Sequence, residues 1–104
     1  MKTLGIDPGL VQTGYGIIDI TQHEPQVLDY GVVKPKVDEG LASRLLTIFE
    51  DVSEIINTHK PSVFSIEDVF YGKNVKSALR LGQARGAAMV AAASLGLSIH
   101  EYSA

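Results

Sequence analysis

The chain has 104 residues, of which 45% are hydrophobic and 20% are charged, and these values are typical of one globular domain. It contains no cysteine, which excludes disulfides and thiolate metal ligands. The formal net charge of −3 argues against a protein that coats nucleic acid with its whole surface.

Neither a secretory signal nor a membrane span is expected. The N-terminal apolar stretch is interrupted by Asp7-Pro8-Gly9 and is too short for a signal peptide. The longest purely apolar run covers residues 87–93, far fewer than a bilayer requires. We therefore expect a cytoplasmic protein.

Three short strands are predicted in the first third of the chain. Residues 3–6 form an apolar run that ends at the turn sequence Asp7-Pro8-Gly9. Residues 14–20 and 27–34 have the composition of two further strands, and the short connections favour an antiparallel meander.

Two helices and two more strands follow. Apolar residues recur with helical spacing over 41–59, and Pro61 stops this helix. A buried strand is predicted over 63–66. Asn74 is a suitable N-cap for a second helix that runs to about Leu95, and Gly96 ends it before a strand over 98–102.

The order β-β-β-α-β-α-β predicts one α/β domain over residues 1–104, with a mixed five-stranded sheet and helices covering its faces. No closing helix follows the last strand, so part of one face should remain uncovered.

Two carboxylates differ from the other acidic residues, because Asp7 and Glu67 each follow a buried apolar strand directly. If these strands are parallel neighbours, both side chains lie at the same edge of the sheet, where open α/β sheets bind ligands. Two adjacent carboxylates raise each other's pKa unless a cation intervenes, and their oxygens suit Mg²⁺ or Mn²⁺. The alternatives are a plain Asx-turn at Asp7 and an exposed acid at Glu67. Asp68 and Glu101 are weaker candidates at this edge.

A basic stretch follows the second acidic strand, since residues 69–100 contain no Asp or Glu. Lys73, Lys76 and Arg80 fall on one side of the predicted second helix near its N-terminus, whereas Arg85 points elsewhere. Cations oppose the helix dipole there, which makes sense if a phosphate is to bind. The alternative is a helix with a few solvated cations.

Phe70 and Tyr71 stand in the loop before this helix, beside the predicted metal site. Aromatic side chains in such a place can stack on unpaired bases. Anchoring of the loop is the alternative role.

The same helix is rich in small residues. From 87 to 93 it is apolar all round, so burial against the sheet alone does not account for it. We expect a homodimer interface on this helix, and the candidate interface residues are Gly82, Gly86, Ala88 and Ala92. The alternative is a helix sandwiched within its own domain.

Three motifs together resemble RuvC-type Holliday-junction resolvases. They are GIDPG with TGYG at residues 5–16, IEDVF at 66–70, and KNVKSALRLGQARG at 73–86. The third is the most specific, and the resemblance covers the whole chain in order.

The resemblance implies an RNase H-like fold and a homodimeric, Mg²⁺-dependent endonuclease of recombination and repair. Such an enzyme nicks two opposed strands of a four-way DNA junction symmetrically. Asp7 and Glu67 would be its catalytic metal ligands, Phe70 would engage bases near the junction centre, and the long helix would build the dimer. A branch-migration motor complex, RuvA and RuvB, is an implied partner.

The family pattern continues to a C-terminal helix with the remaining metal ligands, which is absent here. Residues 1–104 would therefore be the N-terminal two-thirds of such a nuclease domain, weakly active or inactive alone.

Two other readings remain open from the residues. Actin-like ATP-binding domains of the sugar-kinase type also open with a strand, Asp-x-Gly and a second strand, although here only Thr13 offers a hydroxyl to a phosphate. A non-catalytic DNA-binding or dimerisation module is the other alternative.

Overall fold

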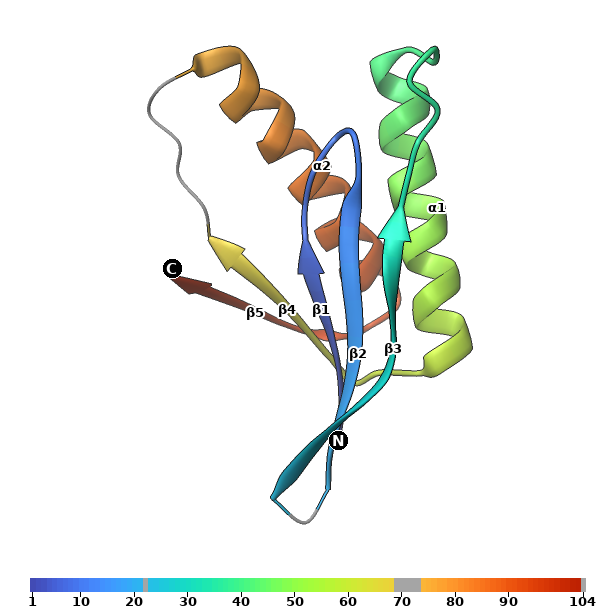
Figure 1. Ribbon diagram of the computed structural model, residues 1–104, viewed down its shortest axis with the longest axis vertical. Coiled ribbons are helices and arrows are strands. Elements are labelled where there is room, and N and C mark those ends of the chain that lie inside the picture. Colours follow the sequence, from blue (N-terminus) through green and yellow to red (C-terminus); the bar gives the residue numbers. More distant parts are fainter. Residues whose placement is uncertain (22, 69–73, 104) are drawn as a thin grey trace.

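The computed structural model describes residues 1–21, 23–68 and 74–103 (Figure 1). Five strands form one sheet, and they are β1 (Lys2–Asp7), β2 (Thr13–Thr21), β3 (Glu24–Val33), β4 (Val63–Asp68) and β5 (Ser98–Ser103). The strand order is β3-β2-β1-β4-β5. The first three strands are antiparallel neighbours, whereas β4 runs parallel to β1 and β5 parallel to β4. The predicted mixed sheet is therefore confirmed.

Two helices connect these strands. α1 (Leu41–His59) joins β3 to β4, and α2 (Val75–Ser94) follows β4 and leads into β5. The predicted caps are present: the Asn74 side chain accepts a hydrogen bond from the Ser77 backbone N–H at 3.1 Å. Gly96, with a φ of 80°, follows the end of α2, a conformation that glycine adopts readily. Neither described helix combines the length and the apolarity that crossing a bilayer requires.

Both helices pack on the same face of the sheet. Alternate residues of the central strands, such as Leu4 and Ile6 in β1 and Phe64 and Ile66 in β4, are buried in one core with the inward residues of α1 and α2. Because side chains alternate across a strand, the residues between them face away from the helices. The prediction that helices flank the sheet is confirmed, but within the described ranges they cover one face only.

The strands are longer than predicted at several ends. β1 includes Asp7 and β4 extends to Asp68. Asp7 is therefore the last residue of its strand and Glu67 the last but one, and neither lies in a loop. β3 begins at Glu24 because the pairing with β2 continues to the tip of the hairpin. This hairpin projects beyond the rest of the sheet (Figure 1).

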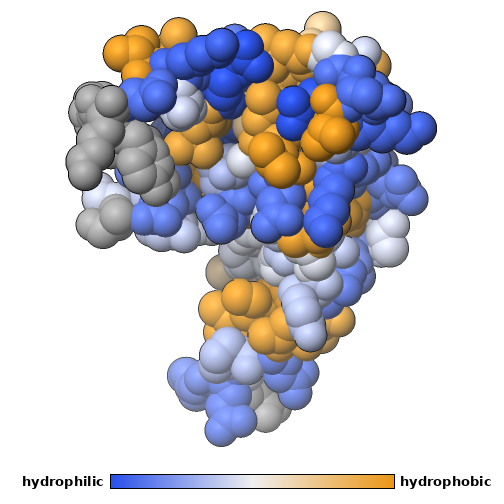
Figure 2. All heavy atoms as spheres, turned by 45° about the horizontal axis from the view of Figure 1, so that its top comes forward, coloured by the Kyte–Doolittle hydropathy of each residue, from blue (hydrophilic) through white to orange (hydrophobic). Residues whose placement is uncertain are grey.

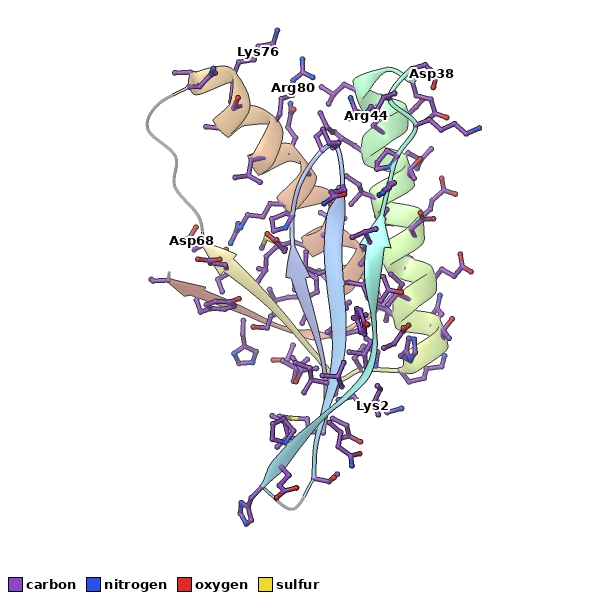
Figure 3. All side chains as sticks on the ribbon, in the orientation of Figure 1. Lys2, Asp38, Arg44, Asp68, Lys76 and Arg80 are labelled. Carbon is purple, nitrogen blue, oxygen red and sulfur yellow. The ribbon has the colours of Figure 1, made fainter. Side chains whose placement is uncertain are left out.

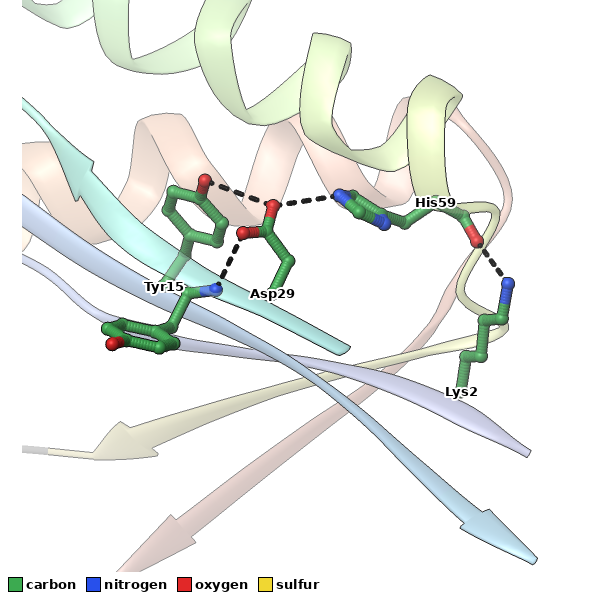
Figure 4. Close-up of polar contacts among 5 residues, drawn as sticks. Lys2, Tyr15, Asp29 and His59 are labelled. Atoms are coloured by element: carbon green, nitrogen blue, oxygen red, sulfur yellow. Dashed lines mark hydrogen bonds and ion pairs between the residues drawn. The ribbon is translucent and has the colours of Figure 1, made fainter. Parts of the chain in front are cut away.

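A polar cluster ties the edge strand β3 to the C-terminal end of α1 (Figure 4). Asp29 accepts hydrogen bonds from the Tyr15 hydroxyl at 3.3 Å and from the Tyr30 backbone N–H at 2.8 Å, and it pairs with His59 Nε2 at 2.9 Å. Burial, together with the Asp29 charge and hydrogen bond, raises the pKa of Tyr15 above its ordinary value. Lys2 Nζ donates to the His59 carbonyl at 3.1 Å. We assign this cluster a structural role.

Candidate metal and DNA-binding site

Asp7 and Glu67 occupy neighbouring positions at the carboxyl ends of two adjacent parallel strands. Their preceding residues, Ile6 and Ile66, are direct partners in the β1–β4 ladder. Neighbouring strands lie about 4.8 Å apart, and residues at equivalent positions point to the same face. Since Ile6 and Ile66 face the helices, the two carboxylates share the uncovered face. The condition on which the shared edge depended, that these two strands are parallel neighbours, is therefore met.

The two side chains are available to a ligand. Asp7 is exposed and Glu67 is half-buried. Among the residues that the structure describes, neither carboxylate makes a hydrogen bond or an ion pair, although Asp19, Asp29 and Glu101 all do. Two free carboxylates on one face have the hard oxygen donors that Mg²⁺ and Mn²⁺ prefer.

This donor set is small. Within residues 1–21, 23–68 and 74–103, no group of three or more acidic or histidine side chains is placed to hold a metal ion. Mg²⁺ commonly binds through one or two carboxylates plus waters and substrate phosphate, so the pair fits one ion. A second ion would need ligands from outside the described residues.

An open depression lies beside the pair on the uncovered face. Its floor is formed by the backbone at Gly5, Gly14 and Gly16, and Asp7 and Tyr102 also line it. A Cβ on Gly14 would lie 3.6 Å from the Asp7 Cβ, so glycine leaves room beside this carboxylate. Sequence reasoning missed Tyr102, which is the β5 partner of Glu67. Only the strand register reveals it.

Asp68 and Glu101 belong to the opposite face and are already paired. Arg85 of α2 forms an ion pair with Glu101, and its guanidinium lies 3.9 Å from Asp68 Oδ1. These two weaker candidates are therefore separated from Asp7 and Glu67 by the sheet itself. The expectation that Arg85 points away from Lys76 and Arg80 is met, but its acidic partners were not predicted.

The described basic residues of the DNA-binding prediction lie at the N-terminal end of α2 (Figure 3). Lys76 and Arg80 border a hollow between α2 and the β1–β2 connection, together with Leu10 and Val11. Figure 2 looks toward this end of the molecule and shows hydrophilic surface beside exposed hydrophobic areas. The remaining predicted DNA-binding residues lie outside the described part of the chain: Phe70, Tyr71 and Lys73.

The β1–β2 connection is held firmly next to Asp7. The Thr13 hydroxyl accepts from the Gly9 N–H at 3.2 Å and donates to the Gly9 carbonyl at 2.8 Å, and Thr13 is fully buried. Arg44, from the first turns of α1, donates to the Leu10 carbonyl at 3.0 Å. Thr13 is thus engaged within the turn, so the one hydroxyl that this turn could offer to a phosphate of ATP is already hydrogen-bonded.

The predicted dimer residues divide into two groups. Ala88 and Ala92 are fully buried in the chain's own core, so they cannot form the surface of an interface, and this part of the prediction is wrong. Gly82 is exposed and Gly86 is half-buried, and a Cβ built on either would meet nothing within 4 Å.

Comparison with known proteins gives a consistent result. The family model described as "Crossover junction endodeoxyribonuclease RuvC" matches residues 3–104. A protein of that name from Heliobacterium modesticaldum is 46% identical over 102 residues, which is 98% of this chain and 63% of the relative. One from Colwellia psychrerythraea is 55% identical over 97% of this chain and 58% of the relative.

A solved structure has the same fold. It is titled "T. thermophilus RuvC in complex with Holliday junction substrate", and it matches with a TM-score of 0.90 and 28% identity. The match covers 99% of this chain and 64% of that one. The mixed sheet flanked by two helices is therefore the RNase H-like arrangement that the resemblance implied.

The chain spans somewhat less than two-thirds of the length of these relatives. The match nevertheless extends over almost all of its own residues, including both carboxylate-bearing strands and the basic helix. The chain belongs to the crossover junction endodeoxyribonuclease RuvC family.

Proposed function

We propose that residues 1–104 are the N-terminal two-thirds of a nuclease domain that resolves four-way DNA junctions by metal-dependent nicking of opposed strands. The observation that carries the proposal is the carboxylate pair of Asp7 and Glu67 at adjoining parallel strand ends, in a chain of this family. Neither carboxylate has a hydrogen-bond or ion-pair partner among the residues that the structure describes. The ATP-binding alternative lacks comparable support.

Asp7 and Glu67 would hold the metal through their carboxylate oxygens. Bound there, Mg²⁺ or Mn²⁺ supplies an activated water and stabilises the charge that develops on the leaving oxygen at phosphorus. Two carboxylates leave most coordination positions to water and to the scissile phosphate. The remaining protein ligands come from the part of the domain that the chain does not include, so the chain alone should be weakly active or inactive.

Lys76 and Arg80 would bind backbone phosphates of the junction. Their position near the N-terminus of α2 lets side-chain charge and backbone N–H groups act on the same anion. Phe70, Tyr71 and Lys73 complete the proposed DNA contacts, with Phe70 stacking on bases near the junction centre.

A homodimer would present two such sites to two opposed strands, which accounts for symmetric nicking of a two-fold symmetric substrate. The exposed face of α2 supplies the contact, and its residues with the required spacing are Leu79, Gly82, Gly86 and Val90. Delivery to the junction by RuvA and RuvB in the cytoplasm belongs to the same proposal.

The test compares the 104-residue chain with an extended chain. The extended chain carries, after Ala104, the segment of the Heliobacterium modesticaldum relative that lies beyond the matched region. We expect the extended chain to nick a labelled four-way junction at symmetric positions in Mg²⁺, and the short chain to cleave very poorly because its donor set is incomplete.

Three other outcomes would contradict this proposal in different ways. Robust symmetric nicking by the short chain would contradict the incomplete site. Junction binding without cleavage by the extended chain would favour a non-catalytic module, and ATP hydrolysis without junction cleavage would favour the kinase-type alternative.

Removing the cations at the start of α2 should change the salt dependence of binding. We expect Lys76→Gln and Arg80→Gln to weaken junction affinity, and each to reduce the slope of log K against log salt by about 1. Fluorescence anisotropy of a labelled junction from low to moderate salt measures both quantities. Lys36→Gln is the matched control, since Lys36 is exposed after β3. Slopes equal to the wild-type value in both α2 variants would exclude phosphate contacts there.

A further inference from the structure

We propose that Arg85 is a positioning residue for the metal site, an inference that rests on the proposed function. It fixes the end of β4, and with it the direction of the Glu67 side chain. It also keeps the carboxylates of Asp68 and Glu101 engaged on the helix face, which leaves Asp7 and Glu67 as the acidic pair open to the metal.

The guanidinium group of Arg85 makes contacts in three directions. Nε donates to the backbone carbonyl of Glu67 at 3.3 Å, and Nη2 forms the ion pair with Glu101. Nη1 lies 3.4 Å from Met89 Sδ, one turn along α2. The side chain is 18% exposed, so these contacts are only partly screened by water.

The sheet divides the nearby carboxylates into two pairs. Glu101 is the β5 partner of Ile66, whose side chain faces the helices, and Asp68 has the same orientation two residues later. Asp7 and Glu67 face the other way. Arg85 reaches the sheet from α2. Its guanidinium therefore pairs with Asp68 and Glu101 on the helix face, and not with the two carboxylates that would bind metal.

Without Arg85, two effects should follow. The last residues of β4 would lose the bond that holds the Glu67 peptide, and this strand leads directly into residues 69–73. Asp68 and Glu101 would also become an unpaired acidic pair that can attract cations itself. A lysine is a poor replacement because its single ammonium cannot reach the carbonyl and the carboxylate in the fork geometry of a guanidinium.

The test uses the extended chain with Arg85→Met, Arg85→Lys and Glu101→Gln. Mn²⁺ affinity is measured by calorimetry without DNA, and the Mg²⁺ concentration for half-maximal cleavage is measured separately. We expect Arg85→Met to lower the Mn²⁺ affinity about tenfold and to raise the Mg²⁺ concentration for half-maximal cleavage by about the same factor. This is the lower end of the effect of residues that orient metal ligands. Arg85→Lys should recover only part of this loss. Glu101→Gln retains the bond to the Glu67 carbonyl and should cause a smaller loss.

Junction affinity in the absence of divalent metal should be unchanged in all three variants. A lower melting temperature with unaltered Mn²⁺ affinity would mean that Arg85 serves stability alone, and the proposal would be overturned. If Arg85→Met does not fold, Arg85→Lys and Glu101→Gln decide by the same criterion. An unsubstituted extended chain that binds no Mn²⁺ would instead defeat the proposed function itself, since Arg85 would then have no metal site to position.

Discussion

Asp7→Asn in the extended chain should reduce junction cleavage about a thousandfold, comparable to the loss of a principal group that stabilises transition-state charge. Glu67→Gln should have an effect of the same order. Both changes remove one negative oxygen from the pair on the uncovered face and keep the size of the side chain. Junction affinity in the absence of divalent metal should remain near the wild-type value, or rise slightly, because a negative charge near the DNA backbone is lost.

Three measurements distinguish this result from damage to the fold. The melting temperature should be unchanged, because neither carboxylate has a partner among the described residues. Mn²⁺ binding measured by calorimetry should be lost together with cleavage. Asp38→Asn is the matched control, since it removes the same charge from an exposed position before α1 and should cleave normally. Wild-type cleavage rates in either site variant would remove the metal-ligand assignment.

The sequence was informative about this site because two local signals coincide. A short apolar run predicts a buried strand, and an acid directly after it predicts a carboxylate at the strand's end. The helix between β3 and β4 then makes a return parallel to β1 the natural topology. Asp7 and Glu67 could therefore be placed at one edge without any knowledge of side-chain contacts.

The long-range partners could not be predicted in the same way. Arg85 and Glu101 are brought together only when β5 returns beside β4, and no local pattern records that pairing. Tyr102 reaches the face of Glu67 for the same reason. A shift of one residue in the register of β5 would exchange the faces of Glu101 and Tyr102.

The side of α2 that faces the core also could not be predicted from the sequence. From 87 to 93 the helix has no polar residue to mark a solvent side, so small residues on the core side and on the exposed side look alike in the sequence. The structure separates them, because Ala88 and Ala92 pack inward while Val90 is 58% exposed. The stripe through Leu79, Gly82, Gly86 and Val90, here called the α2 stripe, is what remains for a partner.

The glycines of the α2 stripe make no close contact with another described part of the chain. A Cβ at Gly82 or Gly86 would meet open space, yet each glycine costs about 1 kcal/mol of helix stability relative to alanine. Two exposed large side chains, Leu79 and Val90, lie on the same face. Close approach of a second α2 helix, as proposed above, would explain both features, since glycine lets two helix backbones come near each other.

Gly82→Leu should therefore dissociate the homodimer, whereas Gly82→Ala should raise the stability of the monomer by about 1 kcal/mol. A leucine at the centre of a close helix contact forces the helices apart, and overpacking of this kind costs about 1–3 kcal/mol at each copy of the residue. Both copies carry the substitution in a two-fold dimer, so the dimer is destabilised at two positions. Sedimentation velocity gives the association state, and urea unfolding gives the stability of the dissociated chain.

Ala42→Leu is the matched control, because Ala42 is exposed on α1, away from the α2 stripe, and the larger side chain should leave the association state unchanged. The order of effects is the decisive result: leucine at position 82 breaks the dimer, and leucine at position 42 does not. A wild-type chain that stays monomeric at high micromolar concentration would show that the α2 stripe is insufficient by itself. If the extended chain then dimerises and Gly82→Leu leaves that dimer intact, the interface lies elsewhere. In that case the glycines of α2 would have to be explained by a contact with the rest of the same domain.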